Sequence, residues 1–379
     1  MKKVLFLPFL QIPSGHHQVV DALREDLEVN YSGLVFDKID VLHYGYGKLE
    51  SLISGIYLKW IHHFPSTYSW LYKSSVYSGA SINKNYKLYE LLFIHFIKKI
   101  LLETKPDIVV CSHALPSYML NQLKKRGFTS VPIVNVYTDF FVHSFWGTNY
   151  IDYHFVSNRN MKNDLITRGI TENQIYVTGI PLHRKILQQT HSRSIPSKPQ
   201  LQCTIMGGSL GVGVIDRLIN KLKPTGQIIY HILCGKNTKL YNQLKNQSCK
   251  YIHPLPYISS REEMDTIYCQ SDFIITKPGG VTVSECLQKR VPIFVYHALP
   301  GQEEINLNEL NKLGVVFPLT DWELYEDLEQ HLLSTYRSEK NLEQYHSSLE
   351  QYHGDFHHEP AAVILDRIIQ ETERKRNAQ

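Results

Sequence analysis

The stretch from Thr276 to Asn306 limits the possible folds of this chain more than any other segment. It follows an apolar run, Phe273–Ile275, that is typical of a buried parallel strand. A Pro-Gly-Gly turn then leads into helical spacing from Val281 to Lys289, and a second apolar strand follows at Val291–Tyr296. Two buried strands joined by a short helix predict a parallel sheet, so we expect an α/β fold.

Each strand of this stretch ends in a glycine turn that is followed by polar groups. In open α/β sheets, ligands bind at the carboxyl ends of the strands. Backbone N–H groups at Gly279, Gly280 and Val281 face the start of the helix, where the helix dipole favours an anion. We therefore expect a nucleotide diphosphate there, with its attached group near Gln302 and Glu303.

Length and composition predict two domains and no nucleic-acid partner. A chain of 379 residues with 43% hydrophobic content is too large for one ordinary core. The net charge of +4 is small, and no block of lysine and arginine suggests nucleic-acid binding. The six scattered cysteines lack CxxC spacing, which is typical of reduced thiols in a cytoplasmic protein.

Two segments have features of sequences that are targeted to, or bind to, a membrane. The N-terminus imitates a signal peptide, but Pro8 interrupts its apolar core, so we expect a first strand at Val4–Leu10. No run approaches the ~20 apolar residues that span a bilayer. Between Tyr44 and Ile100, thirteen aromatic residues, Trp60 and Trp70 among them, occur with seven lysines and only two glutamates. This mixture favours an interfacial membrane contact, although the aromatics could instead cover a core and line a cleft.

A histidine pair follows the first predicted strand. The turn Pro13-Ser14-Gly15-His16-His17 precedes a helical stripe from Gln18 to Leu27. Histidine often only caps or fills a loop. At the carboxyl end of a first strand, however, this pair is also a candidate for a functional site.

A second polar turn follows the predicted strand Val131–Val136. Asp139, His143 and Trp146 lie just beyond the end of this strand. Polar groups at strand ends belong to binding sites more often than to cores in open α/β sheets. Asp139 is therefore a site candidate, with a helix N-cap as the alternative.

The second half of the chain begins a new α/β series. Leu201–Met206 is predicted to be a strand, followed by a glycine loop at Gly207–Gly211 and a helix at Val212–Leu222. The loop has neither the NAD fingerprint nor the Gly-Lys-Ser/Thr end of a P-loop. It lies, however, where a phosphate would meet a helix N-terminus.

A polar segment with two prolines marks the boundary between the two series. We predict a first domain at residues 1–187, a linker at 188–200, a second domain at 201–356, and a C-terminal helical region at 357–379.

Taken together, these turns resemble the processive diacylglycerol glucosyltransferases and monogalactosyldiacylglycerol synthases, and more distantly the lipid II N-acetylglucosaminyltransferase. These are inverting, family 28-like glycosyltransferases of the GT-B architecture. The resemblance implies two Rossmann-like, doubly wound domains facing across a cleft, with a C-terminal helix returning to the first domain. The motifs that carry it are Gly15-His16-His17-Gln18-Val19, Tyr137 to Trp146, Thr178-Gly179-Ile180-Pro181, Cys234-Gly235-Lys236-Asn237-Thr238, Thr276-Lys277-Pro278-Gly279-Gly280 with Ser284-Glu285, and Pro300-Gly301-Gln302-Glu303.

The resemblance also implies roles for individual residues. Glu285 would bind the ribose hydroxyls, the two glycine loops would hold the diphosphate, and Gln302 and Glu303 would contact the hexose. His16 would act in catalysis near the acceptor, with Asp139 in the same cleft. The expected nucleotide-sugar residues are Gly207, Gly208, Ser209, Lys277, Gly279, Gly280, Val281, Thr282, Glu285, Gln302 and Glu303. Those of the acceptor and membrane region are Trp60, Trp70, His143 and Trp146.

The implied reaction is a single displacement that moves a hexose from a UDP-sugar, with UDP-glucose or UDP-galactose favoured, to a lipid acceptor. The expected acceptor is diacylglycerol. We expect a cytoplasmic enzyme that binds peripherally to the anionic inner face of the cell membrane, where this lipid lies. The sequence has no Asp-x-Asp motif of metal-dependent glycosyltransferases, so we expect no metal and no cofactor besides the donor substrate.

One departure from the family pattern bears on the donor. Glu304 stands where these families commonly have a lysine, which changes the charge beside the diphosphate. Three alternatives remain: a transferase with a lipid II-type or soluble acceptor, a sugar-nucleotide epimerase of the same architecture, and a non-catalytic UDP-sugar sensor. The aromatic and basic stretch argues against a soluble acceptor and an epimerase, and the combination of His16 and Asp139 argues against a sensor.

Overall fold

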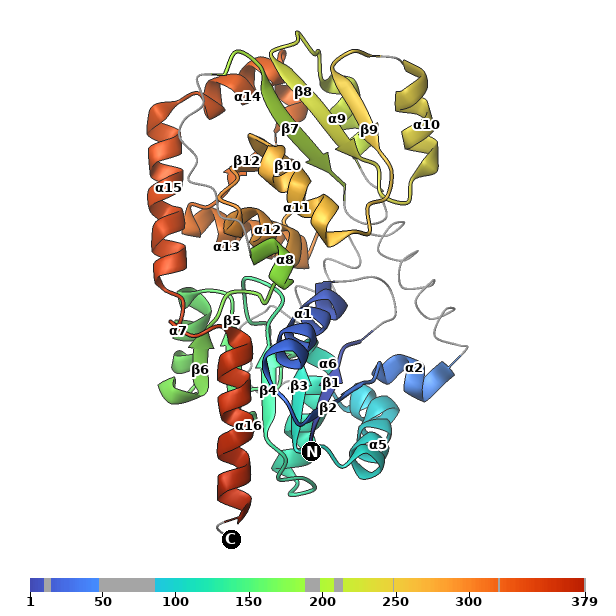
Figure 1. The fold of residues 1–379 in the computed structure, drawn as a ribbon, viewed down its shortest axis with the longest axis vertical. Helices are drawn as coiled ribbons and strands as arrows, with labels where there is room; N and C mark the ends of the chain where they lie inside the picture. Colours follow the sequence, from blue (N-terminus) through green and yellow to red (C-terminus); the bar gives the residue numbers. More distant parts are fainter. Residues whose placement is uncertain are drawn as a thin grey trace. The chain divides into compact units, whose positions relative to one another are not determined.

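The computed structural model describes residues 1–9, 15–47, 86–187, 198–207, 214–247, 249–319 and 321–377. The chain forms two compact units, which Figure 1 shows as ribbons. Unit 1 comprises Met1–His183, Pro300–Gln302 and Asp355–Gln379, and unit 2 comprises Arg184–Leu299 and Glu303–Gly354.

Unit 1 contains a six-stranded sheet in which every strand pairs in parallel with its neighbours. The order is β2-β1-β3-β4-β5-β6, so the winding reverses between β1 and β3. The strands are β1 (Lys2–Leu7), β2 (Leu34–Lys38), β3 (Ile108–Cys111), β4 (Ile133–Val136), β5 (Tyr153–Val156) and β6 (Ile175–Val177).

Helices accompany this sheet, and the C-terminal helix is one of them. They are α1 (Gly15–Asn30), α2 (Val41–Tyr46), α5 (Lys87–Thr104), α6 (Ala114–Lys125), α7 (Arg159–Thr167), the short 3-10 turn η3 (Glu172–Gln174) and α16 (Ala361–Asn377). Figure 1 shows α16 beside α1, which it contacts. The Lys2 ammonium group joins β1 to α16, at 2.8 Å from Oε1 of Gln370 and 2.7 Å from Oε2 of Glu373.

Unit 2 contains a second parallel sheet, with the order β12-β11-β10-β7-β8-β9. Its winding reverses between β7 and β10. The strands are β7 (Leu201–Met206), β8 (Ile228–Leu233), β9 (Ile252–Leu255), β10 (Phe273–Thr276), β11 (Ile293–Val295) and β12 (Phe317–Pro318). The helices are α8 (Arg184–Leu187), α9 (Ile215–Lys221), α10 (Thr238–Gln247), α11 (Arg261–Gln270), α12 (Gly280–Gln288), α13 (Gln302–Leu313), η4 (Trp322–Leu324), α14 (Leu328–Tyr336) and α15 (Glu339–Gly354).

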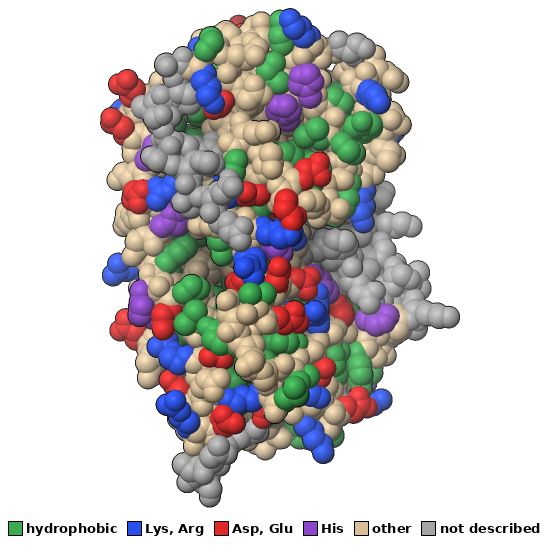
Figure 2. All heavy atoms as spheres, in the orientation of Figure 1, with side chains coloured by type: hydrophobic (Ala, Val, Ile, Leu, Met, Phe, Trp, Pro, Cys, Tyr) green, Lys and Arg blue, Asp and Glu red, His purple; other side chains and the backbone are tan. Residues whose placement is uncertain are grey.

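The central strands form the cores of both units. β3 and β10 are buried along their whole length, which is the pattern of a parallel strand covered on both faces. The predicted α/β class, with two doubly wound sheets, is confirmed. None of the helices in the described ranges is both long and apolar enough to cross a membrane. On the face shown in Figure 2, lysine and arginine side chains lie among aspartate and glutamate side chains.

Candidate functional site

His16 lies in the first turn of α1, after the chain has left β1. Its Nδ1 atom is 2.7 Å from the backbone oxygen of Ser112, which follows β3, and 3.0 Å from Oγ1 of Thr138, which follows β4. The strands β1, β3 and β4 are consecutive in the sheet, and the winding reverses between the first two. His16 therefore lies at the switch point of unit 1, where doubly wound sheets bind their ligands.

The contact with Ser112 determines which nitrogen of His16 carries the proton. A carbonyl oxygen only accepts hydrogen bonds, so Nδ1 is the donor and Nε2 of the neutral ring keeps its lone pair. Burial lowers the pKa of His16 below its ordinary value of 6.5, against the raising effects of Asp139 and the Ser112 hydrogen bond, while His17 lowers it further. The ring is therefore neutral at physiological pH, with Nε2 able to accept a proton, as a general base requires.

His17, the other member of the pair, has a different environment. Its Nε2 atom is 3.6 Å from a carboxylate oxygen of Asp40. The same carboxylate caps α2 by accepting hydrogen bonds from the backbone N–H groups of Leu42 and His43. His17 thus supports the start of α2, whereas His16 faces the strand ends.

Asp139 is 5% exposed and lies in the loop after β4. No helix follows it, so the alternative of a helix N-cap is wrong. Its carboxylate oxygens each lie 2.8 Å from Nε2 of Gln302, a residue that groups with unit 1. Because Asp139 also raises the pKa of His16, three of the predicted site residues interact in this unit.

Two further histidines, His113 and His143, interact electrostatically with His16 and stay neutral. Burial, and then His16 and His143, hold the pKa of His113 well below its ordinary value. Burial, with Arg168 and His16, lowers the pKa of His143 to about 3. Nδ1 of each ring accepts a hydrogen bond from a backbone N–H, that of Leu115 or Phe145, so the proton lies on Nε2. Each ring therefore carries its N–H at Nε2.

The predicted aromatic residues of the acceptor region divide into two groups. Trp146 is 5% exposed, and its ring packs 4.5 Å from that of Tyr137 in the core of unit 1. A role in core packing therefore accounts for Trp146. Trp60 and Trp70 lie outside the described residues.

In unit 2, the loops after β7 and β10 flank the switch point, because these two strands are neighbours in the sheet. Gly207 is buried directly after β7. Gly208 and Ser209 lie outside the described residues. The loop after β10 is described in full, and it contains the described part of the expected anion site.

The N-terminus of α12 offers backbone donors. The first N–H groups of a helix have no partner within it, and here these belong to Gly280, Val281 and Thr282. The N-cap residue is Gly279, which makes no side-chain cap hydrogen bond. The expectation that the Gly279 N–H is also available is wrong, because it donates to the backbone oxygen of Lys277 at 2.9 Å. The available donors are thus displaced by one residue from those predicted.

Gly279 has no steric reason of its own to be glycine. Its φ of −77° suits any residue, and an added Cβ would meet no atom of the described chain within 4 Å. The missing side chain therefore leaves space at the end of α12 that carries the free N–H groups. Close approach of a ligand to the backbone is a common reason for such a glycine.

Glu285, on the second turn of α12, is buried, with 5% of its surface exposed. Its Oε2 atom accepts a 2.6 Å hydrogen bond from the hydroxyl of Tyr268, and its Oε1 atom is 3.6 Å from the Arg261 guanidinium. Burial raises the pKa of Glu285, while Tyr268 and Arg261 lower it and Asp265 raises it. These two neighbours thus favour the charged carboxylate in a site with little water.

Glu303 lies in the first turn of α13, where its Oε2 atom accepts a 2.6 Å hydrogen bond from the backbone N–H of Leu299. Burial raises the pKa of Glu303, and Lys277 and the Leu299 hydrogen bond lower it. Lys277, from the turn after β10, is therefore close enough to supply positive charge beside Glu303. This interaction links the turn after β10 to the first turn of α13.

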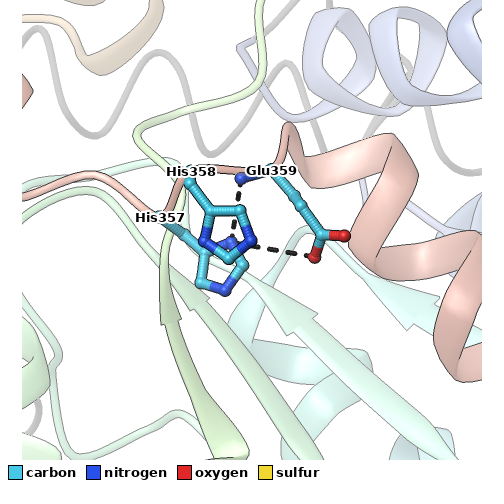
Figure 3. A group of neighbouring side chains, drawn as sticks. All are labelled: His357, His358 and Glu359. Carbon is cyan, nitrogen blue, oxygen red and sulfur yellow. Dashed lines mark hydrogen bonds and ion pairs between the residues drawn. The ribbon is translucent and has the colours of Figure 1, made fainter.

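One group among the described residues has the spacing of metal ligands. Figure 3 shows His357, His358 and Glu359 just before α16, with three potential ligand atoms within 4.8 Å of one another. Arg367 already forms an ion pair with Glu359 at 3.0 Å, and Nδ1 of His357 accepts the Glu359 backbone N–H at 3.1 Å. These contacts account for the group as a support for the start of α16, and we assign it no metal.

Sequence reasoning did not identify Ser112, Thr138, His113 and Tyr268 as parts of these sites. Ser112 contributes its backbone oxygen, which leaves no mark on residue type. Tyr268 occupies an apolar position of α11, where an aromatic residue indicates only a core. The strand-end position of Thr138 was the available signal, since it lies two residues after the predicted strand Val131–Val136, and His113 lies two residues after β3.

Comparison with known proteins identifies the family of the chain. The model of the monogalactosyldiacylglycerol synthase family matches residues 16–182, and the family 28 glycosyltransferase C-terminal domain matches residues 202–359. An uncharacterized glycosyltransferase of Bacillus subtilis, YkoN, is 44% identical over 97% of this chain and 98% of that protein. A processive diacylglycerol beta-glucosyltransferase of Bacillus cytotoxicus is 30% identical over 74% of this chain and 72% of its own length.

A solved structure supports the predicted architecture. MurG of Acinetobacter baumannii matches with a TM-score of 0.63 at 15% identity, covering 99% of this chain and 100% of that protein. At this identity the likeness concerns the fold alone. It confirms the predicted GT-B class.

Proposed function

This chain belongs to the monogalactosyldiacylglycerol synthase family of glycosyltransferases, and on that premise we propose that it moves a hexose from a UDP-sugar to diacylglycerol. UDP-glucose and UDP-galactose are the donors we favour. The observation that carries the proposal is the neutral His16, whose Nδ1 is held by Ser112 and whose Nε2 can accept a proton. A non-catalytic sensor has no need of such a base.

The donor site is proposed for the carboxyl end of the unit 2 sheet. The N–H groups of Gly280, Val281 and Thr282 and the positive charge of Lys277 would bind the diphosphate. The carboxylate of Glu285 would accept hydrogen bonds from the two ribose hydroxyls. Gln302 and Glu303 would contact the hexose, for which an amide and a carboxylate are suitable partners.

The proposed reaction is a single displacement with inversion at the anomeric carbon. Nε2 of His16 takes the proton of the acceptor hydroxyl as its oxygen bonds to the anomeric carbon, while the bond from that carbon to the diphosphate oxygen breaks and UDP leaves. Asp139 favours the imidazolium that forms, since it raises the pKa of His16. The backbone donors of α12 and Lys277 stabilise the leaving diphosphate, so we expect no metal requirement.

The lipid acceptor and a peripheral position on the inner face of the cell membrane are part of the same proposal. The name of the Bacillus cytotoxicus relative supports diacylglycerol as the acceptor class. Among the described residues, α5 exposes Leu91 at 75% and Leu102 at 64%, with Lys99 on the same helix. Exposed leucine with lysine suits contact with an anionic lipid surface.

A substrate screen tests the proposal directly. The purified protein is incubated with UDP-glucose, UDP-galactose or UDP-N-acetylglucosamine, with and without diacylglycerol in anionic vesicles, and products are identified by mass spectrometry. We expect UDP release and a new glycolipid only when diacylglycerol and a UDP-hexose are both present. Conversion of a UDP-sugar to its epimer without acceptor would instead identify an epimerase. Binding without any turnover would identify a sensor.

A further inference from the structure

A polar face joins α11 to α12 beneath the proposed ribose site. Tyr268 on α11 donates to Oε2 of Glu285 at 2.6 Å, and Arg261, at the start of α11, lies 3.6 Å from Oε1 of the same carboxylate. One helical turn further along, the fully buried Lys289 pairs with Asp265 of α11 at 2.6 Å. Residues four apart lie on one face of a helix, so these contacts hold α11 and α12 in a single register.

Among the residues of this polar face, Tyr268 makes the closest contact with the Glu285 carboxylate. It is 1% exposed, so water does not compete for its hydroxyl. Burial, and then the charge of Glu285, raise the pKa of Tyr268 well above its ordinary value, so the hydroxyl stays protonated and donates. Its hydrogen bond is one of the two interactions that favour the charged form of Glu285.

This geometry leaves the carboxylate able to accept further hydrogen bonds. An ionised carboxylate has about four acceptor positions, and Tyr268 occupies one of them. A single donor at a fixed point also limits rotation of the carboxylate plane. Two vicinal hydroxyls then meet an acceptor whose orientation is already set, which reduces the entropy lost on binding.

We propose that Tyr268 is a positioning residue for nucleotide binding, which holds the Glu285 carboxylate charged and oriented to receive the two ribose hydroxyls. The inference rests on the proposed function, because it requires that Glu285 bind ribose. Tyr268 itself touches no substrate in this proposal. Its effect should therefore depend on whether the ligand carries ribose hydroxyls.

The same chain provides a matched control. Tyr230 on β8 donates to Oε2 of Glu329 at 2.9 Å, and the two residues are 0% and 1% exposed. Glu329 also accepts the backbone N–H of Thr225, which precedes β8, so this pair lies at the amino end of the sheet. Tyr230→Phe thus removes the same kind of buried hydrogen bond away from the proposed site.

The test measures the affinity of the full chain for UDP and for 2′,3′-dideoxy-UDP by titration calorimetry. We expect the unmodified protein to prefer UDP, and Tyr268→Phe to weaken UDP binding about tenfold, as loss of a hydrogen bond to a charged group would. Binding of the dideoxy nucleotide should change little. Tyr230→Phe should keep the full preference for UDP. In a Glu285→Gln background, Tyr268→Phe should have no further effect on the preference.

The ratio of the two affinities is measured on one sample, so a reduced folded fraction cancels from it. Should the Phe variant not fold, Tyr268→Met provides a second replacement. A full UDP preference in the folded Tyr268 variant, or an equal loss for both nucleotides, would overturn the role of Tyr268 while leaving the ribose role of Glu285 intact. Equal binding of both nucleotides by the unmodified protein would overturn the ribose role itself, and this inference with it.

Discussion

His16→Ala should abolish transfer while leaving the fold and UDP binding nearly unchanged. Nδ1 of the ring donates to the backbone oxygen of Ser112 and also contacts Oγ1 of Thr138, and the side chain lies half-buried at the switch point of unit 1. Losing a hydrogen bond of this kind costs about 0.5–1.5 kcal/mol of stability. Losing a general base lowers the rate about 10²–10⁴-fold, which corresponds to roughly 3–5 kcal/mol in the barrier. The catalytic effect should therefore far exceed the structural one.

The protonation of His16 also predicts how activity should change with pH. Protonation of Nε2 removes the base, so activity is full above the pKa of His16 and falls as the pH drops through it. Because burial lowers this pKa below 6.5, the acid limb should lie below 6.5. Asp139 raises the pKa of His16 and His17 lowers it. Asp139→Asn should thus move the limb to lower pH, and His17→Ala should move it to higher pH.

The assay follows UDP release with diacylglycerol vesicles as a function of pH, with UDP affinity measured separately. His17→Ala is the matched control, since it removes the adjacent histidine of the same helical turn and leaves His16 in place. Turnover by His16→Ala within about tenfold of the unmodified enzyme would refute the general-base role. An acid limb at or above 6.5, or shifts of the same sign in the Asp139 and His17 variants, would refute the electrostatic argument.

Three further substitutions separate function from stability. Gly279→Ala should change the free energy of unfolding by less than about 1 kcal/mol, since its φ is negative and an added Cβ would meet no atom of the described residues within 4 Å, yet weaken UDP binding measured by calorimetry. Gly179→Ala should destabilise the chain in denaturant unfolding, because φ is +70° and the Cβ would lie 2.8 Å from the Phe356 ring. Burial lowers the pKa of His154 to about 3, so the unfolded chain takes up a proton that the folded chain does not as the pH falls below 6.5. The free energy of unfolding therefore decreases as the pH falls below 6.5. His154→Gln should reduce the slope of this decrease by up to about 1.4 kcal/mol per pH unit, measured by denaturant unfolding at several pH values.

The sequence was sufficient to predict the central strands but not the edges of the sheets. β7 and β10 are largely apolar and mostly buried, and the predicted strands Leu201–Met206 and Phe273–Ile275 agree with them to within one residue. β2 at one edge includes Asp37 and Lys38, and β12 at another has only two residues, one of them Pro318. Edge strands are covered on fewer sides and need fewer apolar residues, so hydrophobic patterning marks them weakly.

The site was predictable where its residues follow strand ends and unpredictable where backbone geometry decides. The histidine pair and Asp139 could be selected because the ends of two strands were visible in the sequence. The pattern alone could not show which of His16 and His17 faces the site, since that depends on the rotation of α1 against the sheet. Likewise, a glycine-rich turn predicts free N–H groups, but only its conformation reveals that Gly279 donates to Lys277.

The two buried tyrosine–glutamate pairs of unit 2 show why residue chemistry alone does not identify a site. Tyr268–Glu285 and Tyr230–Glu329 have the same donor, the same acceptor and almost the same burial. They differ in topology, because Glu285 follows the carboxyl end of β10, whereas Glu329 receives the N–H of a residue that precedes β8. In a parallel sheet only the carboxyl ends adjoin the switch point, where loops diverge and leave room for a ligand. The first pair can therefore serve a nucleotide, and the second serves the fold.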